Sequence, residues 1–128
     1  MAHKSVIIEI CNNPQKIEQG FRVFSTEFSL GHGRIDIVGR DRNRVLCLIE
    51  AKVHNGEIPK GERQIKQYRE QLLKLLEYAG VQLPIRIFVV TPKRTVDLGV
   101  KMSFPIAPSE VSSDIPLSHE IFGLKKEK

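Results

Sequence analysis

The segment from residue 45 to residue 53 constrains the fold more than any other, because it is apolar on both faces of an expected strand. Alternate side chains form two apolar sets, which are Val45, Cys47, Ile49 and Ala51 on one face and Leu46 and Leu48 on the other. A strand of this kind belongs in the middle of a sheet that is covered on both sides. A chain of 128 residues suits one such core, so we expect a single domain over residues 1–128.

The segments before this strand predict helical turns followed by two further strands. Spaced apolar residues between residues 5 and 19 indicate one or two short helical pieces, broken at Asn12-Asn13-Pro14, where Asn can cap a helix and Pro can begin one. From Phe21 to Leu30 apolar and polar residues alternate, as in a strand with one buried face. The side chains expected on the buried face are Phe24, Thr26, Phe28 and Leu30.

Two turns connect these strands into an antiparallel meander. Gly31-His32-Gly33 predicts a hairpin into a strand over residues 34–38. The next turn, residues 39–44, leads into the apolar segment, and Asn43 is expected there in the left-handed conformation.

The remaining pattern predicts a crossover connection. Apolar residues at helical spacing predict a helix over residues 61–78 that ends at Gly80, and their stripe consists of Ile65, Tyr68, Leu72, Leu75, Leu76 and Ala79. A β-rich run over residues 85–90 then predicts a strand parallel to the apolar one. We therefore expect an α/β fold with a mixed central sheet flanked by helices and a core over about residues 5–92. Residues 93–128 are expected to form a C-terminal extension with a flexible tail.

Composition narrows the class of protein without defining its function. The 20 Lys and Arg against 15 Asp and Glu give a net charge of +5, which favours polyanionic partners only weakly. Two cysteines cannot build a disulfide framework or a Cys-based zinc site, and the apolar runs are too short to span a membrane. We expect a cytoplasmic protein in a reducing compartment, with no membrane partner and no small-molecule cofactor.

Charged residues interrupt the apolar strip at its end. Glu50 and Lys52 are two positions apart and so share a face of the strand with Leu46 and Leu48. The preceding hairpin can place Asp36 beside Glu50 on that face. Two buried carboxylates repel each other and are costly unless they are paired or bind a cation.

These residues predict a metal site. Asp36, Glu50 and the backbone carbonyl of Ala51 would hold Mg²⁺ or Mn²⁺ through oxygen and leave positions for water and a phosphate. Lys52 would orient or deprotonate the attacking water. The alternative is that Glu50 and Lys52 form an ordinary ion pair and that Asp36 is only a hairpin residue. An Asp in a β-rich run, followed by Glu-x-Lys in an apolar strand before a helix, favours the metal site.

At these residues the sequence resembles the PD-(D/E)XK nuclease superfamily, which has a restriction-endonuclease-like core of helix, three-stranded meander, helix and strand. More narrowly, it resembles the nuclease domain of NucS/EndoMS-type archaeal endonucleases over about residues 13–92, and Holliday-junction resolvases are further relatives by motif. The segments that carry the narrower resemblance are Asn13-Pro14, Ile17-Glu18-x-Gly20-Phe21, Gly33-Arg-Ile-Asp-Ile, Arg40-Asp41 and Leu48-Ile-Glu-Ala-Lys.

The resemblance implies further site residues. RecB-like members carry Gln-x-x-x-Tyr on the helix after the Glu-x-Lys strand, and Gln64 and Tyr68 stand at that spacing. They would support the site or touch the substrate, although Tyr68 fits the apolar stripe equally well. An acid on the first helix would complete the catalytic set; Glu9 is preferred and Glu18 competes, and both also fit as solvent-facing helix residues.

The function expected is that of an enzyme, a Mg²⁺- or Mn²⁺-dependent endonuclease that cuts branched, flapped or mismatched DNA in repair, recombination or replication. Basic residues around the turns are candidates for DNA contact, namely Arg34, Arg40, Arg42 and Arg44. A homodimer would let two sites address two strands. The alternatives are a DNA-binding module that is inactive or needs a partner to cut, and an RNA-directed or structural protein whose charges merely pair.

Overall fold

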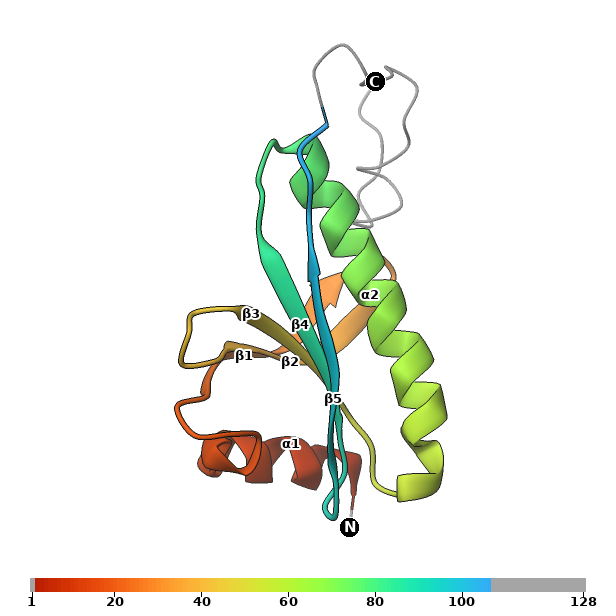
Figure 1. Ribbon diagram of the computed structural model, residues 1–128. Helices are drawn as coiled ribbons and strands as arrows, with labels where there is room; N and C mark the ends of the chain where they lie inside the picture. The colour runs from red at the N-terminus through yellow and green to blue at the C-terminus, as the bar shows by residue number, and fades with distance from the viewer. Residues whose placement is uncertain (1, 107–128) are drawn as a thin grey trace.

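The computed structural model describes residues 2–106, which form one sheet with helices packed against it (Figure 1). The helices are α1 (His3–Asn12) and α2 (Ile58–Tyr78), with 3-10 turns η1 (Pro14–Lys16) and η2 (Asn55–Glu57). The strands are β1 (Arg22–Leu30), β2 (Gly33–Arg40), β3 (Leu46–Ala51), β4 (Pro84–Val90) and β5 (Thr95–Met102), in the spatial order β1-β2-β3-β4-β5. Among the strands that the structure describes, only β3 and β4 pair in parallel; the other neighbours are antiparallel. The expected α/β fold with a mixed central sheet is confirmed.

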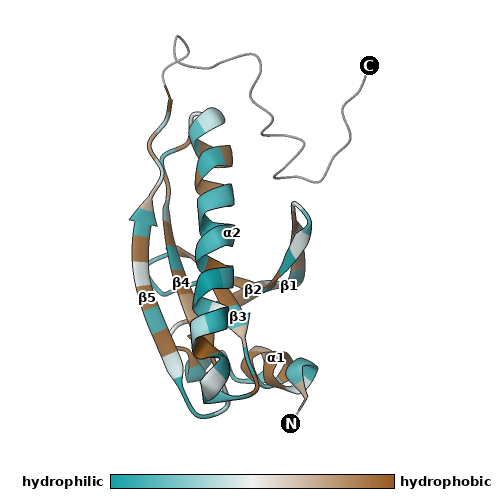
Figure 2. Ribbon diagram, turned by 90° about the vertical axis from the view of Figure 1, so that its right-hand side faces the viewer, coloured by the Kyte–Doolittle hydropathy of each residue, from teal (hydrophilic) through white to brown (hydrophobic). Residues whose placement is uncertain are grey.

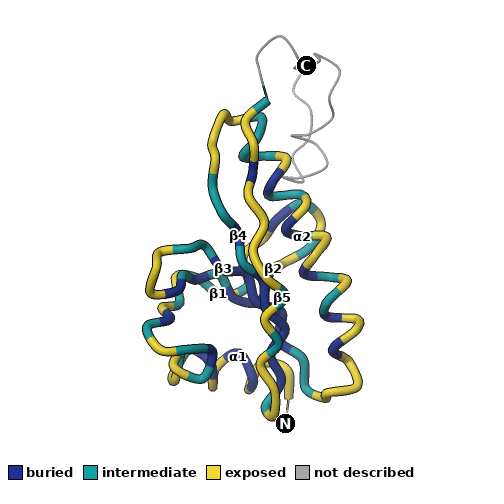
Figure 3. Tube along the Cα trace, in the orientation of Figure 1, coloured by how far each residue is buried: buried dark blue, intermediate teal, exposed yellow. Residues whose placement is uncertain are grey.

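Strand β3 is central and is covered on both faces, as its two apolar sets predict. Cys47, Ile49 and Ala51 pack with α1 in a core that includes Val6 and Ile10. On the other face Leu48 packs with residues of α2 and β4, which are Ile58, Ile65, Leu73, Ile85, Ile87 and Val89. Figure 3 shows the buried segments gathered in the middle of the fold.

The two helices begin and end close to the expected positions. The first helix breaks before Pro14, which opens η1, although the Asn13 side chain makes no capping hydrogen bond in the described structure. Helix α2 presents alternating polar and apolar residues along its length (Figure 2), and it ends before Gly80, whose φ of 76° reverses the chain. Within residues 2–106, neither helix combines the length and the apolar character needed to cross a membrane.

The face of β1 that was expected to be buried is mostly exposed. Phe24 is 61% exposed and Phe28 45%, and of the predicted set only Leu30 is buried. β1 is an edge strand, and its register against β2 shifts between Val23 and Ser25, which makes Phe24 the extra residue of a bulge. The alternation therefore predicted the strand correctly and its buried face wrongly, because the helices pack mainly over the central strands.

The turn between β2 and β3 also differs from the expected geometry. Arg44, with a φ of 66°, is the left-handed residue, and Asn43 is not. The Asp41 carboxylate accepts the backbone N–H groups of Asn43 at 2.8 Å and Val45 at 3.0 Å. These two hydrogen bonds hold Asn43 inside the turn and move the left-handed position one residue further on.

The sheet continues past residue 92, where the sequence pattern placed the end of the core. Strand β5 pairs antiparallel with β4. Only Val96 and Leu98 of this strand pack against the α2-side core, so its sequence carries little apolar signal. The expected flexible tail falls on residues 107–128, which lie outside the described residues.

Arg86 ties several separate segments to β4. Its guanidinium donates to Glu18 at 2.8 Å, to Asp41 at 3.0 Å and to Asp97 at 2.7 Å. It also lies 4.7 Å from the centre of the Phe88 ring. One cation thus joins the segment after η1, the β2–β3 turn and β5.

Replacing Arg86 by leucine should lower the free energy of unfolding by about 2 kcal/mol, because Asp41 stays buried without its cation. Urea titration at neutral pH measures this loss. The hydrogen bond from Arg86 lowers the pKa of Asp97, so the stability that Asp97 contributes is present above the ordinary carboxyl range and is lost as pH falls through the lowered value. The difference between the variant and the wild type should therefore shrink in acid.

The control for this variant is Arg94→Leu, on the exposed turn between β4 and β5. It should change the free energy of unfolding by less than about 0.5 kcal/mol. Equal effects of the two substitutions would contradict the bridging role of Arg86.

Candidate functional site

Asp36 and Glu50 come together where β2 and β3 separate. Their ladder runs from Arg40 opposite Leu46 to Ile37 opposite Ile49, and the two acids are the next residues along each strand. Beyond this point the backbone N–H of Ala51 donates to Asp36 Oδ2 at 2.8 Å. The Asp36 carboxylate thus accepts a hydrogen bond from a backbone N–H that a backbone carbonyl would accept if the two strands continued to pair. This hydrogen bond directs the Asp36 side chain toward the end of β3.

Both acids are buried, and together with Lys52 they form a compact charged group. Asp36 is 8% exposed and Glu50 6%. Lys52 Nζ lies 3.7 Å from Glu50 Oε2, whereas the buried Oε1 of Glu50 has no hydrogen-bond partner among the described residues. The pKa of Glu50 is raised to about 8, first by burial and then by repulsion from Asp36, against the lowering effect of Lys52.

The chemistry of these atoms fits Mg²⁺ or Mn²⁺. Both ions prefer oxygen ligands, and Mg²⁺ commonly takes one or two carboxylates and keeps several waters. Asp36 and Glu50 supply two carboxylates, one with an orphaned oxygen. Within residues 2–106 no cluster of three or more His, Cys, Asp and Glu side chains has a metal-binding arrangement, so any such ion would rely on these two acids, a backbone carbonyl and water.

His3 reaches the same group and was missed by the sequence analysis. Its Nε2 lies 3.1 Å from Asp36 Oδ2, at the start of α1. The contact joins residues 33 positions apart. No local sequence pattern around His3 predicts this contact with Asp36, because the contact depends on how α1 packs against the sheet.

The two candidates for a first-helix acid do not reach these carboxylates. Glu9 is exposed on α1, which buries Val6, Ile7 and Ile10 instead. Glu18 accepts a hydrogen bond from Arg86. In the parallel pairing of β3 with β4, Arg86 stands beside Cys47 and Val89 stands beside Glu50. The side chains at positions 47 and 50 point to opposite faces of the sheet. Arg86 and Glu18 therefore lie on the other face of the sheet from Glu50.

Tyr68 both packs in the core and holds the β1–β2 hairpin. Its hydroxyl accepts the backbone N–H of Arg34 at 3.0 Å, and a side chain at Gly33 would collide with it. Burial raises the pKa of the Tyr68 hydroxyl and the charges of Glu50 and Asp36 raise it further, against the hydrogen bond from Arg34. Tyr68 is therefore packed between the hairpin and α2, near the two acids.

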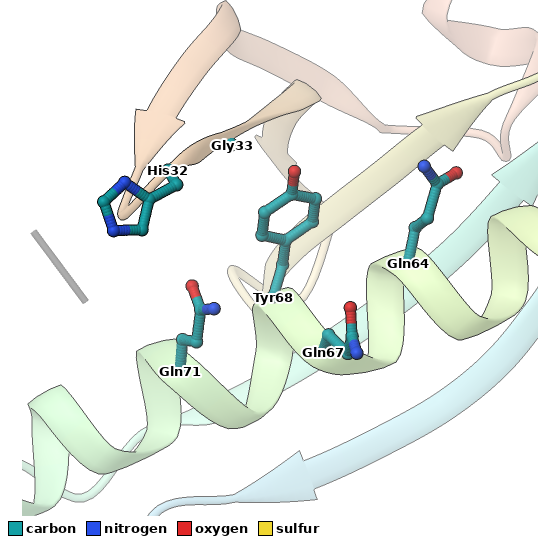
Figure 4. A pocket seen from close by; sticks show the side chains of 6 residues that line it. All are labelled: His32, Gly33, Gln64, Gln67, Tyr68 and Gln71. Carbon is teal, nitrogen blue, oxygen red and sulfur yellow. The ribbon is translucent and has the colours of Figure 1, made fainter. Parts of the chain in front are cut away.

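Gln64 joins Tyr68 in a pocket of about 280 Å³ between α2 and the hairpin (Figure 4). The residues that line it are His32, Gly33, Gln64, Gln67, Tyr68 and Gln71. Figure 4 shows Tyr68 between Gln64 and Gln71 on one side of α2, with the Tyr68 hydroxyl toward the hairpin. Gln64 and Tyr68 both line this pocket, and the hairpin contributes His32 and Gly33, which the sequence analysis did not single out for the site.

The four arginines proposed for DNA contact fall into two groups. Arg34 is exposed on the hairpin side and pairs with Glu27 at 3.0 Å. Arg40, Arg42 and Arg44 lie around the β2–β3 turn, at the opposite end of these strands from the two acids. They do not form one cluster, because the meander separates its two turns by a strand length.

Comparison with known proteins gives a consistent result. Residues 3–98 match the family described as the endonuclease NucS C-terminal domain. Endonuclease NucS of Thermococcus kodakarensis is 34% identical over 86 residues, which is 67% of this chain and 32% of that protein. Endonuclease NucS of Methanocaldococcus jannaschii is 33% identical over 61 residues, 48% of this chain and 23% of that protein.

A solved structure shares the fold. It is described as an EndoMS-dsDNA complex, and it matches with a TM-score of 0.57 and 29% identity over 70% of this chain and 35% of that one. The chain therefore spans about a third or less of the length of these relatives.

Replacing Glu50 by glutamine should stabilise the metal-free protein by about 3 kcal/mol near pH ~7. In the folded wild type Glu50 keeps its proton up to about pH 8, whereas in the unfolded chain the carboxyl loses it near 4.5. The folded state binds more protons between these values, so the free energy of unfolding falls as pH rises through this window. Glutamine does not titrate, and the variant should lack this decline.

Denaturant titrations across this pH range, with a metal chelator present, provide the measurement. Glu9→Gln is the matched control, because Glu9 is exposed and should leave the pH profile of stability unchanged. A Glu50→Gln profile parallel to that of the wild type would show that the pKa of Glu50 is not raised in the folded protein.

Proposed function

The chain belongs to the endonuclease NucS C-terminal domain family, and on this basis we propose that it is the cutting domain of a metal-dependent DNA endonuclease. The observation that carries the proposal is the pair of buried acids, Asp36 and Glu50, beside Lys52 at the end of β3. Two relatives are named endonuclease NucS, and a similar solved structure is described as an EndoMS-dsDNA complex. The activity and the DNA substrate are transferred to this chain as proposals, since it spans only part of each.

We assign the site to the PD-(D/E)XK type. Asp36 corresponds to the acid of the second strand, and Glu50 and Lys52 correspond to Glu-x-Lys of the third. Gln64 and Tyr68 then take the positions of the RecB-like Gln-x-x-x-Tyr. The meander that brings Asp36 to Glu50, and the helix that follows β3, support this assignment.

Asp36, Glu50 and the carbonyl of Ala51 would hold Mg²⁺ or Mn²⁺. When bound, the ion would neutralise charge that develops on the phosphate and favour ionisation of the attacking water. The Ala51 N–H orients Asp36, and the orphaned Glu50 Oε1 provides an oxygen that is not committed elsewhere. Lys52, largely buried beside Glu50, would orient the water or take its proton.

Charge and topology suggest how DNA would lie on the domain. Arg34 stands on one side of the acids, and Arg40, Arg42 and Arg44 stand on the other side along the meander. Phosphates on either side of the cut would contact these two groups. The proposed substrates are branched, flapped or mismatched DNA, and a homodimer would bring two such sites to the two strands.

Asp36→Asn, Glu50→Gln and Lys52→Met should each slow DNA cleavage by roughly 100- to 1000-fold, because each removes charge from the reacting centre. A gel assay with flap, junction, mismatch and single-stranded DNA, in Mg²⁺ and in Mn²⁺, measures the rates. Glu70→Gln is the control, since Glu70 lies exposed on α2 and pairs with Lys101. Full activity in Glu50→Gln would overturn the proposed site.

The same assay separates the alternative function. A wild-type chain that binds these DNAs but cuts none of them with either metal would be a DNA-binding module that needs a partner. Binding of RNA in preference to DNA at the same salt concentration would favour an RNA-directed protein.

Arg42→Gln and Arg34→Gln should each reduce the slope of log affinity against log salt concentration by about 1, because each removes one phosphate contact. Affinities for one duplex over a range of salt concentrations provide the measurement. Lys101→Gln is the control, because Lys101 lies on β5, at the sheet edge furthest from β1 and β2, and should leave the slope unchanged. An unchanged slope for both arginine variants would place the DNA on another surface.

A further inference from the structure

A second pocket, of about 330 Å³, lies where β3 and β4 end. Because these strands are parallel, their carboxyl ends lie at the same edge of the sheet, and Figure 1 shows the β4–β5 turn at the same end of the fold as the start of α2. The backbone N–H of Lys52 donates to the Val90 carbonyl at 2.9 Å. The pocket begins one residue beyond Lys52, which is proposed to handle the attacking water. We call it the strand-end pocket, and the residues that line it are Val53, His54, Asn55, Pro92 and Lys93.

The charges at the strand-end pocket favour an anion. Its lining contains one lysine, Lys93, and no aspartate or glutamate. Lys93 is exposed and forms no ion pair with any carboxylate of residues 2–106. A second cation is fixed beside the pocket, because the Lys16 ammonium donates to the Pro92 carbonyl at 3.0 Å. Two positive charges at one cavity attract a phosphate.

Thr91 holds the walls of the strand-end pocket together and orients Asn55. The Thr91 side chain is buried, and its hydroxyl donates to Asn55 Oδ1 at 2.6 Å. The same hydroxyl accepts the backbone N–H groups of Lys93 at 3.3 Å and Arg94 at 3.0 Å. These hydrogen bonds join η2 to the β4–β5 turn. Because Oδ1 of Asn55 is occupied, its amide has two N–H groups left, and no acceptor among residues 2–106 takes them.

The polar groups of the lining suit a phosphate better than a base. They are the Lys93 ammonium, the Asn55 amide N–H groups and an imidazole N–H of His54, and all of them are donors. Glu57 lies outside the lining, and its carboxylate accepts the backbone N–H of His54 at 3.4 Å. Successive phosphates of one DNA strand lie about 3.4 Å apart along the duplex axis. A strand with one phosphate at the two acids therefore brings a neighbouring phosphate close to this pocket.

We propose that the strand-end pocket binds a backbone phosphate of the DNA strand that is cut, next to the phosphate at the two acids, through Lys93 and the Asn55 amide. The proposal rests on the proposed function, because DNA is the ligand. It gives the cut strand a fixed point at the same edge of the sheet as the acids. Arg40, Arg42 and Arg44 cannot supply this point, because they lie at the opposite end of their strands.

The test removes one phosphate charge and one protein charge together. Glu50→Gln protein, which should not cut, is titrated without metal with duplex DNAs in which one phosphate at a time is a neutral methylphosphonate. At one position the replacement should weaken binding by about 10-fold. In the Glu50→Gln, Lys93→Gln double variant this loss should fall below about 2-fold, because the phosphate charge no longer meets its partner. Where the wild type cuts the same duplex, the position should lie within about two phosphates of the cut.

Arg94→Gln is the charge-matched control, since Arg94 is exposed on the same turn but does not line the pocket. In this background the methylphosphonate effect should persist. Asn55→Asp is the second variant, because the new carboxylate keeps an oxygen for the Thr91 hydroxyl but replaces the donors by a negative charge. It should abolish the effect at the same position. Both Lys93→Gln and Asn55→Asp should leave thermal stability unchanged, which a structural role of these side chains would not allow.

The proposal is overturned if no single phosphate shows the effect, if the effect survives in Lys93→Gln, or if Arg94→Gln removes it equally. Failure to bind DNA at all would overturn both this proposal and the proposed function. Cleavage is read separately, in protein with intact acids and metal. A chain that shows the coupling but cuts no DNA would refute the proposed cutting and support the pocket. A chain that cuts DNA without the coupling would do the reverse.

Discussion

The burial of β3 on both faces determines the arrangement of the rest of the protein. An apolar strand of this kind requires a cover on each side, and α1 and α2 provide the two covers. Its parallel neighbour β4 requires a crossover, which α2 supplies. The same burial extends to Glu50, and this is why a carboxylate near the end of the strand has a raised pKa.

A buried acid is tolerated here because the strand ends beside it. The pairing of β2 with β3 ends at Ile37 and Ile49. Beyond these residues, polar groups take the place of the backbone hydrogen bonds between the two strands. Asp36 accepts the Ala51 N–H, and Lys52 stands beside Glu50. The charges compensate each other only in part, since Glu50 Oε1 has no hydrogen-bond partner within residues 2–106. Stability is given up at the place where the domain is proposed to hold a cation.

The sequence was sufficient for the parts of this structure that depend on periodicity. The apolar sets of β3, the stripe of α2 and the spacing of Asp36 from Glu50 all predicted the arrangement that is found. Sequence patterns failed to predict those features that depend on contacts between residues far apart in the chain. The alternation that includes Phe24 and Phe28 indicates a strand. The position of this strand at the edge of the sheet determines which of its faces is buried.

Contacts between distant residues account for the other differences. His3 reaches Asp36 across 33 positions, and neither Glu9 nor Glu18 does so. β5 was not predicted because polar groups hold it more than apolar ones do. Asp97 binds Arg86 at 2.7 Å, and the Gly99 carbonyl accepts from the buried Arg69 at 3.0 Å. Such hydrogen bonds produce no periodic pattern in a sequence. They help to hold β5, which covers the edge of β4 on the side away from the two acids.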